Sequence, residues 1–157
     1  MAITTLTVGL GQINPIVGDF EGNARKIISY ITTAEARGID LLIFPELAIS
    51  GYPVWDLANK TNFVEKGLKA LSEITAATLK AHVVVAVGFI DRANAKSGKS
   101  HNAIAVLRKG KIVHKQYKTL LPTYDVFLEE IFFASETEHK TFRLNGIPMA
   151  TSICEDI

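Results

Sequence analysis

The chain has 157 residues, and 17 Lys and Arg against 16 Asp and Glu give it a formal net charge of +1. With 48% hydrophobic residues, this length supports one hydrophobic core and argues against a long disordered tail. The lysines are spread from Lys26 to Lys140, without the basic stripe typical of nucleic-acid or membrane-surface binders. We therefore expect a small molecule or another protein as partner, and neither nucleic acid nor a membrane.

The first residues carry no features of a secretory signal, and no apolar run approaches the roughly 20 residues that span a bilayer. These features predict a cytoplasmic protein. A single cysteine, Cys154, excludes an intrachain disulfide. The four histidines lack the spacing of a helical zinc site, so no metal is expected. They are His82, His101, His114 and His139.

The first half of the chain predicts a strand over residues 6–14, followed by a helix. Asn23 is the expected N-cap of that helix, and Gly38 suits the left-handed position after its end. Residues 39–44 form an apolar run of strand length, and apolar side chains at helical spacing over 64–79 predict a second helix.

Strands dominate the second half. The β-branched run at 83–88 predicts a strand covered on both faces. Two hairpins follow, one pairing 103–107 with 112–117 and the other pairing 142–144 with 147–153. Helical crossovers connect parallel strands and tight turns connect antiparallel ones, so this order predicts an α/β fold with a mixed sheet.

Three side chains could carry chemistry: Glu46, Lys118 and Cys154 follow the carboxyl ends of predicted strands. In open α/β sheets, that edge is where sites form. A thiol with its free pKa of ~8.5 is only a few per cent thiolate at pH 7, so a nucleophilic cysteine needs a base or a cation nearby. Glutamate and lysine would supply one of each.

Each of these residues also has an ordinary structural interpretation. A lone cysteine at the end of an apolar strand is usually buried and inert, and a lone lysine is usually a solvated surface charge. A glutamate after a proline can simply end a strand. Composition and spacing leave these alternatives open.

Three segments carry a resemblance to a known family. They are Phe44-Pro-Glu-Leu-Ala-Ile-Ser-Gly-Tyr52, Lys118-Thr-Leu-Leu-Pro-Thr-Tyr124 and Ile153-Cys-Glu-Asp156. Together and in this order they resemble the signature blocks of the nitrilase (carbon–nitrogen hydrolase) superfamily. The resemblance covers essentially the whole chain, and it implies that Glu46, Lys118 and Cys154 form the catalytic triad of that family.

Within the superfamily, the chain is most similar to the glutaminase domains of glutamine-dependent NAD synthetases. The segments that carry this likeness include Gly11-Gln-Ile-Asn-Pro-Ile-Val-Gly-Asp19 and Leu121-Pro-Thr-Tyr-Asp-Val-Phe127. The resemblance implies that Tyr124 and Phe127 hold the substrate glutamine. It also implies a supporting glutamate at Glu129, with Glu130 as the alternative because the flanking residues depart from the family pattern.

The chemistry that the resemblance implies is hydrolysis of the glutamine amide through a thioester. Glu46 would be the base and Cys154 the nucleophile, and Lys118 with the backbone N–H of Glu155 would stabilise the oxyanion. This step needs no cofactor. The ammonia would serve a synthetase domain that uses ATP and Mg and that is absent from this chain, and the resemblance suggests a homo-oligomer.

The implied fold is a nitrilase-like α-β-β-α sandwich, with residues 1–157 forming the N-terminal part of the glutaminase domain. We expect it to be incomplete at its C-terminal end. Two other functions remain open. One is a free-standing amidase or nitrilase of the same superfamily, and the other is a catalytically silent, truncated interaction module.

Overall fold

The computed structural model describes residues 5–92 and 97–157 of the chain. Within these residues, five strands form one sheet in the order β1-β2-β3-β4-β5. They are β1 (Val8–Leu10), β2 (Leu41–Ile43), β3 (Val84–Asp91), β4 (His101–Arg108) and β5 (Lys111–Tyr117). The first three strands are parallel, and β4 and β5 are each antiparallel to the strand before them. This topology confirms the predicted mixed sheet.

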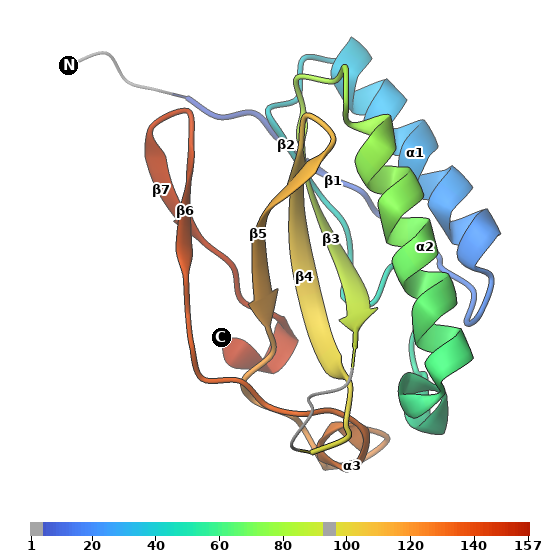
Figure 1. The fold of residues 1–157 in the computed structure, drawn as a ribbon. Helices are drawn as coiled ribbons and strands as arrows, with labels where there is room; N and C mark the ends of the chain where they lie inside the picture. Colours follow the sequence, from blue (N-terminus) through green and yellow to red (C-terminus); the bar gives the residue numbers. More distant parts are fainter. Residues whose placement is uncertain (1–4, 93–96) are drawn as a thin grey trace.

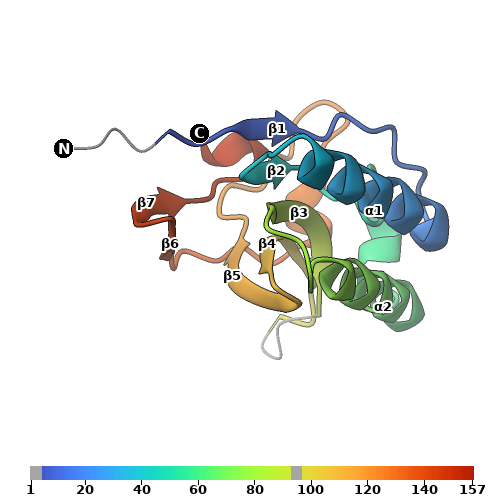
Figure 2. The same ribbon diagram turned by 90° about the horizontal axis from the view of Figure 1, so that it is seen from above.

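The described chain forms three layers (Figure 1, Figure 2). Helices α1 (Phe20–Ala36) and α2 (Thr61–Ala77) lie together over one face of the sheet. The hairpin of β6 (Thr141–Leu144) and β7 (Ile147–Ala150) lies on the other side. The short helical segments are η1 (Trp55–Asn59), α3 (Glu129–Phe132) and η2 (Cys154–Asp156). The second helical layer of the predicted sandwich is not found in residues 5–92 and 97–157.

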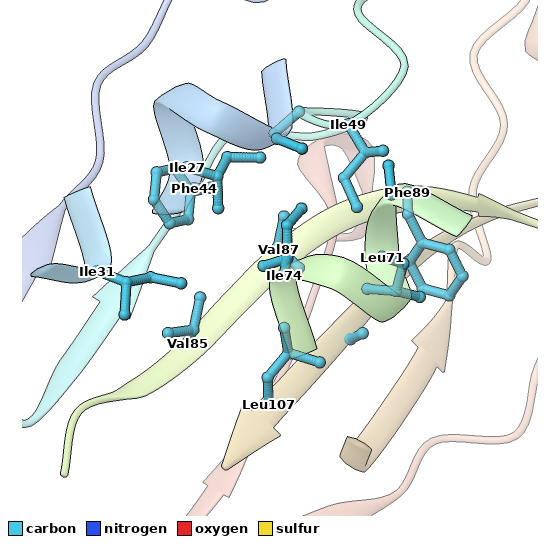
Figure 3. Packing of buried hydrophobic residues seen from close by; sticks show 14 of the residues in the cluster. Ile27, Ile31, Phe44, Ile49, Leu71, Ile74, Val85, Val87, Phe89 and Leu107 are labelled. Atoms are coloured by element: carbon cyan, nitrogen blue, oxygen red, sulfur yellow. The ribbon is translucent and has the colours of Figure 1, made fainter. Parts of the chain in front are cut away.

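The main hydrophobic core lies between the sheet and the two helices (Figure 3). Every second residue of β3 points toward the helices, because side chains alternate along a strand. These residues are Val85, Val87 and Phe89, and they pack with Ile27 of α1 and Ile74 of α2. Burying an aliphatic or aromatic side chain of this size stabilises the fold by roughly 1.5–3 kcal/mol, so this layer holds the sheet in place.

The opposite face of the sheet is apolar in its middle and polar near one end. Leu41, Val84 and Val106 pack there against Leu144 of the hairpin. Toward the carboxyl ends of β2, β3 and β5, the buried side chains become polar. They are Asn102, Gln116 and Lys118. Because side chains alternate along each strand, these three buried polar groups share the face of the sheet away from the helices.

The start of α1 differs from the expectation. Its N-cap is Asp19, whose Oδ1 accepts a hydrogen bond from the Gly22 amide at 2.9 Å. Asn23 lies inside the helix, where its buried side chain bonds the backbone of Ile16 and Ile49. The prediction of Asn23 as the cap is wrong because its side chain makes long-range contacts. Gly38 has φ +65°, as predicted for the residue after the helix end.

The strand boundaries also differ. The opening strand is shorter than 6–14, and β7 ends at Ala150, before residue 153. Cys154 therefore does not follow a strand directly but begins η2. Both hairpins are confirmed. The turn between β4 and β5 places Lys109 and Gly110 at positive φ, which is the backbone of the two-residue turns that suit strand twist.

Candidate active site

Glu46 lies just beyond the end of β2, on a segment that passes close over β3. The contact is made at Gly88. A Cβ atom at that position would lie 2.4 Å from the Leu47 nitrogen and 2.7 Å from the Pro45 oxygen. Only glycine fits beneath this backbone, and its small size lets Glu46 approach the polar face of the sheet.

Lys118 immediately follows β5 and is completely buried. Its Nζ lies 2.8 Å from Glu46 Oε1 and 2.8 Å from Glu129 Oε2. Its backbone N–H donates to the carbonyl oxygen of Asn102 at 2.8 Å. The interpretation of Lys118 as a solvated surface charge is therefore wrong. The lysine links two carboxylates that are distant in sequence.

The pKa values of this cluster reflect burial and charge together. Burial by itself would lower the pKa of Lys118, but the hydrogen bonds and charges of Glu129 and Glu46 outweigh it and raise the pKa. Lys118 therefore stays an ammonium at neutral pH. Burial is the main cause that raises the pKa of Glu129, and the nearby Glu46 carboxylate adds to the rise while Lys118 opposes it.

Glu129 occupies the first turn of α3 and is 4% exposed. Besides Lys118, it contacts Tyr52, whose hydroxyl donates to Oε1 at 3.2 Å. Its neighbour Glu130 is exposed, and its backbone oxygen accepts a hydrogen bond from Lys99 Nζ at 2.6 Å. Of the two candidate glutamates, the structure places Glu129 beside Lys118.

Cys154 begins η2 with φ +51°, a left-handed conformation that is uncommon for a residue with a side chain. The residue is exposed, so the expectation of a buried cysteine is wrong. Its thiol is nevertheless partly desolvated, and this burial raises the pKa of the thiol. The Glu46 carboxylate raises it further, whereas Lys118 and the backbone N–H of Glu155 lower it. Glu46 and Cys154 also line one small pocket.

The segment that carries the cysteine is tied to the segment that follows Lys118. Asp156 makes this connection through three backbone N–H groups. Its Oδ1 accepts from Thr119 at 3.0 Å and from Leu120 at 2.8 Å, and its Oδ2 accepts from Ile153 at 3.3 Å. Asp156 thus fixes the thiol segment relative to the lysine.

The two residues expected to hold substrate lie beside η2. The Tyr124 hydroxyl donates to Glu155 Oε2 at 2.8 Å, and its ring packs edge-on against Phe127 with centroids 5.6 Å apart. An open pocket of about 460 Å³ lies here, with Tyr124, Glu130 and Glu155 among its lining residues. A smaller pocket of about 110 Å³ is lined by Glu46 and Cys154.

Sequence reasoning missed four contributors to this site: Tyr52, Gly88, Asn102 and the bonding role of Asp156. A glycine inside a β-branched run is a known sign of close backbone approach, so Gly88 could have been found. Asn102 is a polar residue at the start of an apolar strand, but its partner is 56 residues away. No local pattern reveals such a contact.

The arrangement unites the groups that amide chemistry requires. Near the carboxyl ends of β2 and β5, the Glu46 carboxylate contacts the Lys118 ammonium and lines one pocket with the Cys154 thiol. The carboxylate can move a proton, the thiol can attack a carbonyl carbon, and the ammonium can stabilise negative charge on its oxygen.

Comparisons with known proteins identify relatives of the chain. The family model for carbon-nitrogen hydrolases matches residues 7–157. The glutamine-dependent NAD(+) synthetase of Thermotoga maritima is 40% identical over 152 residues, which cover 97% of this chain and 26% of that protein. The enzyme of the same name from Synechocystis sp. is 36% identical over 157 residues, covering 96% and 28%. The chain thus spans about a quarter of the length of these relatives.

Solved structures show the same fold. A glutamine-dependent NAD+ synthetase from Acinetobacter baumannii, solved with ADP, superposes with a TM-score of 0.86 at 32% identity. The match covers 95% of this chain and 27% of that one. An amidase from Nesterenkonia sp. superposes with a TM-score of 0.79 at 17% identity, over 96% of this chain and 56% of that one.

Proposed function

Because the chain belongs to the carbon-nitrogen hydrolase family, we propose that it hydrolyses the side-chain amide of glutamine with Cys154, Glu46 and Lys118. The observation that carries the proposal is the completely buried Lys118 ammonium, which lies 2.8 Å from Glu46 and from Glu129, next to the thiol. Burying a charge in this way is costly, and such clusters with shifted pKa values are typical of functional sites.

The first half of the reaction begins from the protonated thiol. Its pKa is raised, so a free thiolate is scarce at neutral pH, and proton transfer to Glu46 accompanies attack of sulfur on the amide carbon. The carbon–sulfur bond forms and the carbonyl oxygen becomes an oxyanion. Glu46 then returns the proton to the amide nitrogen, the carbon–nitrogen bond breaks, and ammonia leaves.

The oxyanion needs donors that are already in place. Lys118 Nζ and the backbone N–H of Glu155 are the proposed pair, and both lie beside the thiol. Glu129 holds the ammonium on its other side, so Lys118 keeps its position and its charge during the reaction. Losing one such donor typically costs on the order of 10²–10³ in rate.

Water completes the cycle. Glu46 takes a proton from a water molecule as its oxygen attacks the thioester carbon, and the sulfur leaves and recovers a proton. The products are glutamate and the free thiol, so one carboxylate serves both halves. The step uses only groups of this chain and needs no cofactor.

The charge of the open pocket at Tyr124 favours glutamine as the substrate. Glu130 and Glu155 are among its lining residues, and negative charge there attracts the α-ammonium group of an amino acid. An uncharged aliphatic amide would gain nothing from them. The exposed Tyr124 ring and Phe127 offer apolar surface for the methylene groups of the same substrate.

The ammonia has a proposed acceptor. Relatives that match nearly the whole of this chain are glutamine-dependent NAD(+) synthetases about four times its length. We infer that the ammonia passes to a synthetase domain that uses ATP and Mg to amidate its substrate.

The test is glutamate release from glutamine by the complete gene product, compared with Cys154→Ala. We expect the variant to lose turnover while keeping ammonia-dependent synthesis. Equal glutamate release by both proteins would refute the nucleophile. Hydrolysis of simple aliphatic amides in preference to glutamine would favour a free-standing amidase. An intact fold whose Cys154 resists 6-diazo-5-oxo-norleucine would favour a silent interaction module.

A further inference from the structure

Asn102 is a buried polar residue to which the proposed mechanism gives no part. It is the second residue of β4 and is 1% exposed. Its side chain shares the sheet face of Ile104 and Val106, away from the helices, because alternate strand residues share a face. That is the face on which Glu46 and Lys118 meet.

The contacts of Asn102 reach both charged members of the site. Its Nδ2 donates to Glu46 Oε1 at 2.6 Å, and its backbone oxygen accepts from the Lys118 amide at 2.8 Å. Lys118 Nζ bonds the same Oε1 of Glu46 at 2.8 Å. Two donors thus converge on one oxygen of the carboxylate.

The other end of the Asn102 amide makes no such contribution. Its Oδ1 is buried and has no hydrogen-bond partner within residues 5–92 and 97–157. An unpaired buried acceptor costs stability, so the fold gains little from this amide as a whole. The hydrogen bond from Nδ2 to Glu46 therefore explains the presence of a buried asparagine here better than a contribution to stability does.

We propose that Asn102 is a positioning residue for the general base: with Lys118 it occupies Oε1 of Glu46 and leaves Oε2 as the oxygen that exchanges protons with the thiol and with water. The inference rests on the proposed amide hydrolysis. A carboxylate that accepts two donors on one oxygen cannot rotate freely.

The main test is Asn102→Leu in the complete gene product. Leucine has nearly the same size, removes both polar atoms of the amide and keeps the backbone bond to Lys118. We expect kcat for glutamine to fall at least tenfold with little change in KM.

Thermal unfolding distinguishes positioning from a structural role. Asn102→Leu should unfold at the parental temperature or above it, because it removes an acceptor that is already unpaired. The matched control is Thr78→Val, at the far end of the sheet, which removes a buried hydroxyl that donates to Thr75 and accepts from Gly110. The control should lose thermal stability and keep the parental kcat and KM at a temperature where it remains folded.

Two results would overturn the proposal. One is an unchanged kcat in Asn102→Leu. The other is a loss of activity that is accompanied by a lower unfolding temperature and is therefore explained by lost stability. If the parent does not hydrolyse glutamine, the proposed function fails. The ¹⁵N resonance of the Asn102 side-chain amide then tests the contact between Asn102 and Glu46 separately. A resonance that moves with pH and loses this dependence in Glu46→Gln supports positioning, whereas one that is insensitive to both refutes it.

Discussion

Replacing Gly88 by alanine should displace the proposed base, Glu46, without changing its side chain. The new Cβ would lie 2.4 Å from the Leu47 nitrogen and 2.9 Å from the Glu46 carbonyl carbon. The backbone has to retreat by about 1 Å to reach the 3.4 Å at which ordinary contacts begin. Because Glu46 Oε1 lies 2.8 Å from Lys118, a retreat of this size breaks that hydrogen bond.

The expected cost is large for catalysis and moderate for stability. A misplacement of ~1 Å at a catalytic group costs about 10²-fold in rate, and overpacking a tight site costs about 1–3 kcal/mol of unfolding free energy. We therefore expect kcat/KM for glutamine to fall about 100-fold in Gly88→Ala. Stopped assays of glutamate release measure kcat/KM, and urea unfolding measures the free energy of unfolding.

The matched control is Ile74→Val, which removes one buried methyl group from α2 on the helix side of the sheet. It should lose about 0.5–1.5 kcal/mol and keep the parental kcat/KM. If Gly88→Ala hydrolyses glutamine at the parental rate while it remains folded, then close approach at Gly88 does not set the position of Glu46, and our reasoning about this contact is wrong.

Three further substitutions test other parts of the site and fold. Lys118→Met should cut glutamate release by about 10²–10³ and destabilise the fold by about 3–5 kcal/mol, because it leaves the buried Glu129 carboxylate and the partly buried Glu46 carboxylate without their shared cation. A parental rate and melting temperature would contradict this. Glu46→Gln removes a negative charge that raises the pKa of Cys154, so the pH midpoint of Cys154 alkylation by iodoacetamide should move downward. An upward move would refute the influence of Glu46 on the thiol. Asn23→Ala leaves three backbone hydrogen-bonding groups without their side-chain partner and should lose about 3 kcal/mol in urea unfolding, without change in the pH–rate profile.

The sheet and the convergence of its site were predictable from local patterns. Apolar runs and turn residues indicate the strands, and the parallel order brings their carboxyl ends to one edge. Glu46 and Lys118 meet there as expected. The cysteine reaches the same edge by a different route, because β7 ends four residues earlier and a left-handed residue at Cys154 turns the chain.

The remaining features depend on contacts between residues far apart in the chain. Asn23 has the composition of a helix cap, but its side chain bonds backbone groups up to 26 residues away. The choice between Glu129 and Glu130 depends on how one short helix is rotated against the buried Lys118. No periodicity encodes these contacts, so they become visible only when the packed structure is known.

The most direct test of the catalytic centre is a crystal structure of the complete gene product after reaction with 6-diazo-5-oxo-norleucine. We expect the analogue to be bonded covalently to Cys154 Sγ, with its carbonyl oxygen within hydrogen-bond distance of Lys118 Nζ and of the Glu155 amide. An unmodified Cys154, or an adduct whose oxygen points away from both donors, would contradict the account.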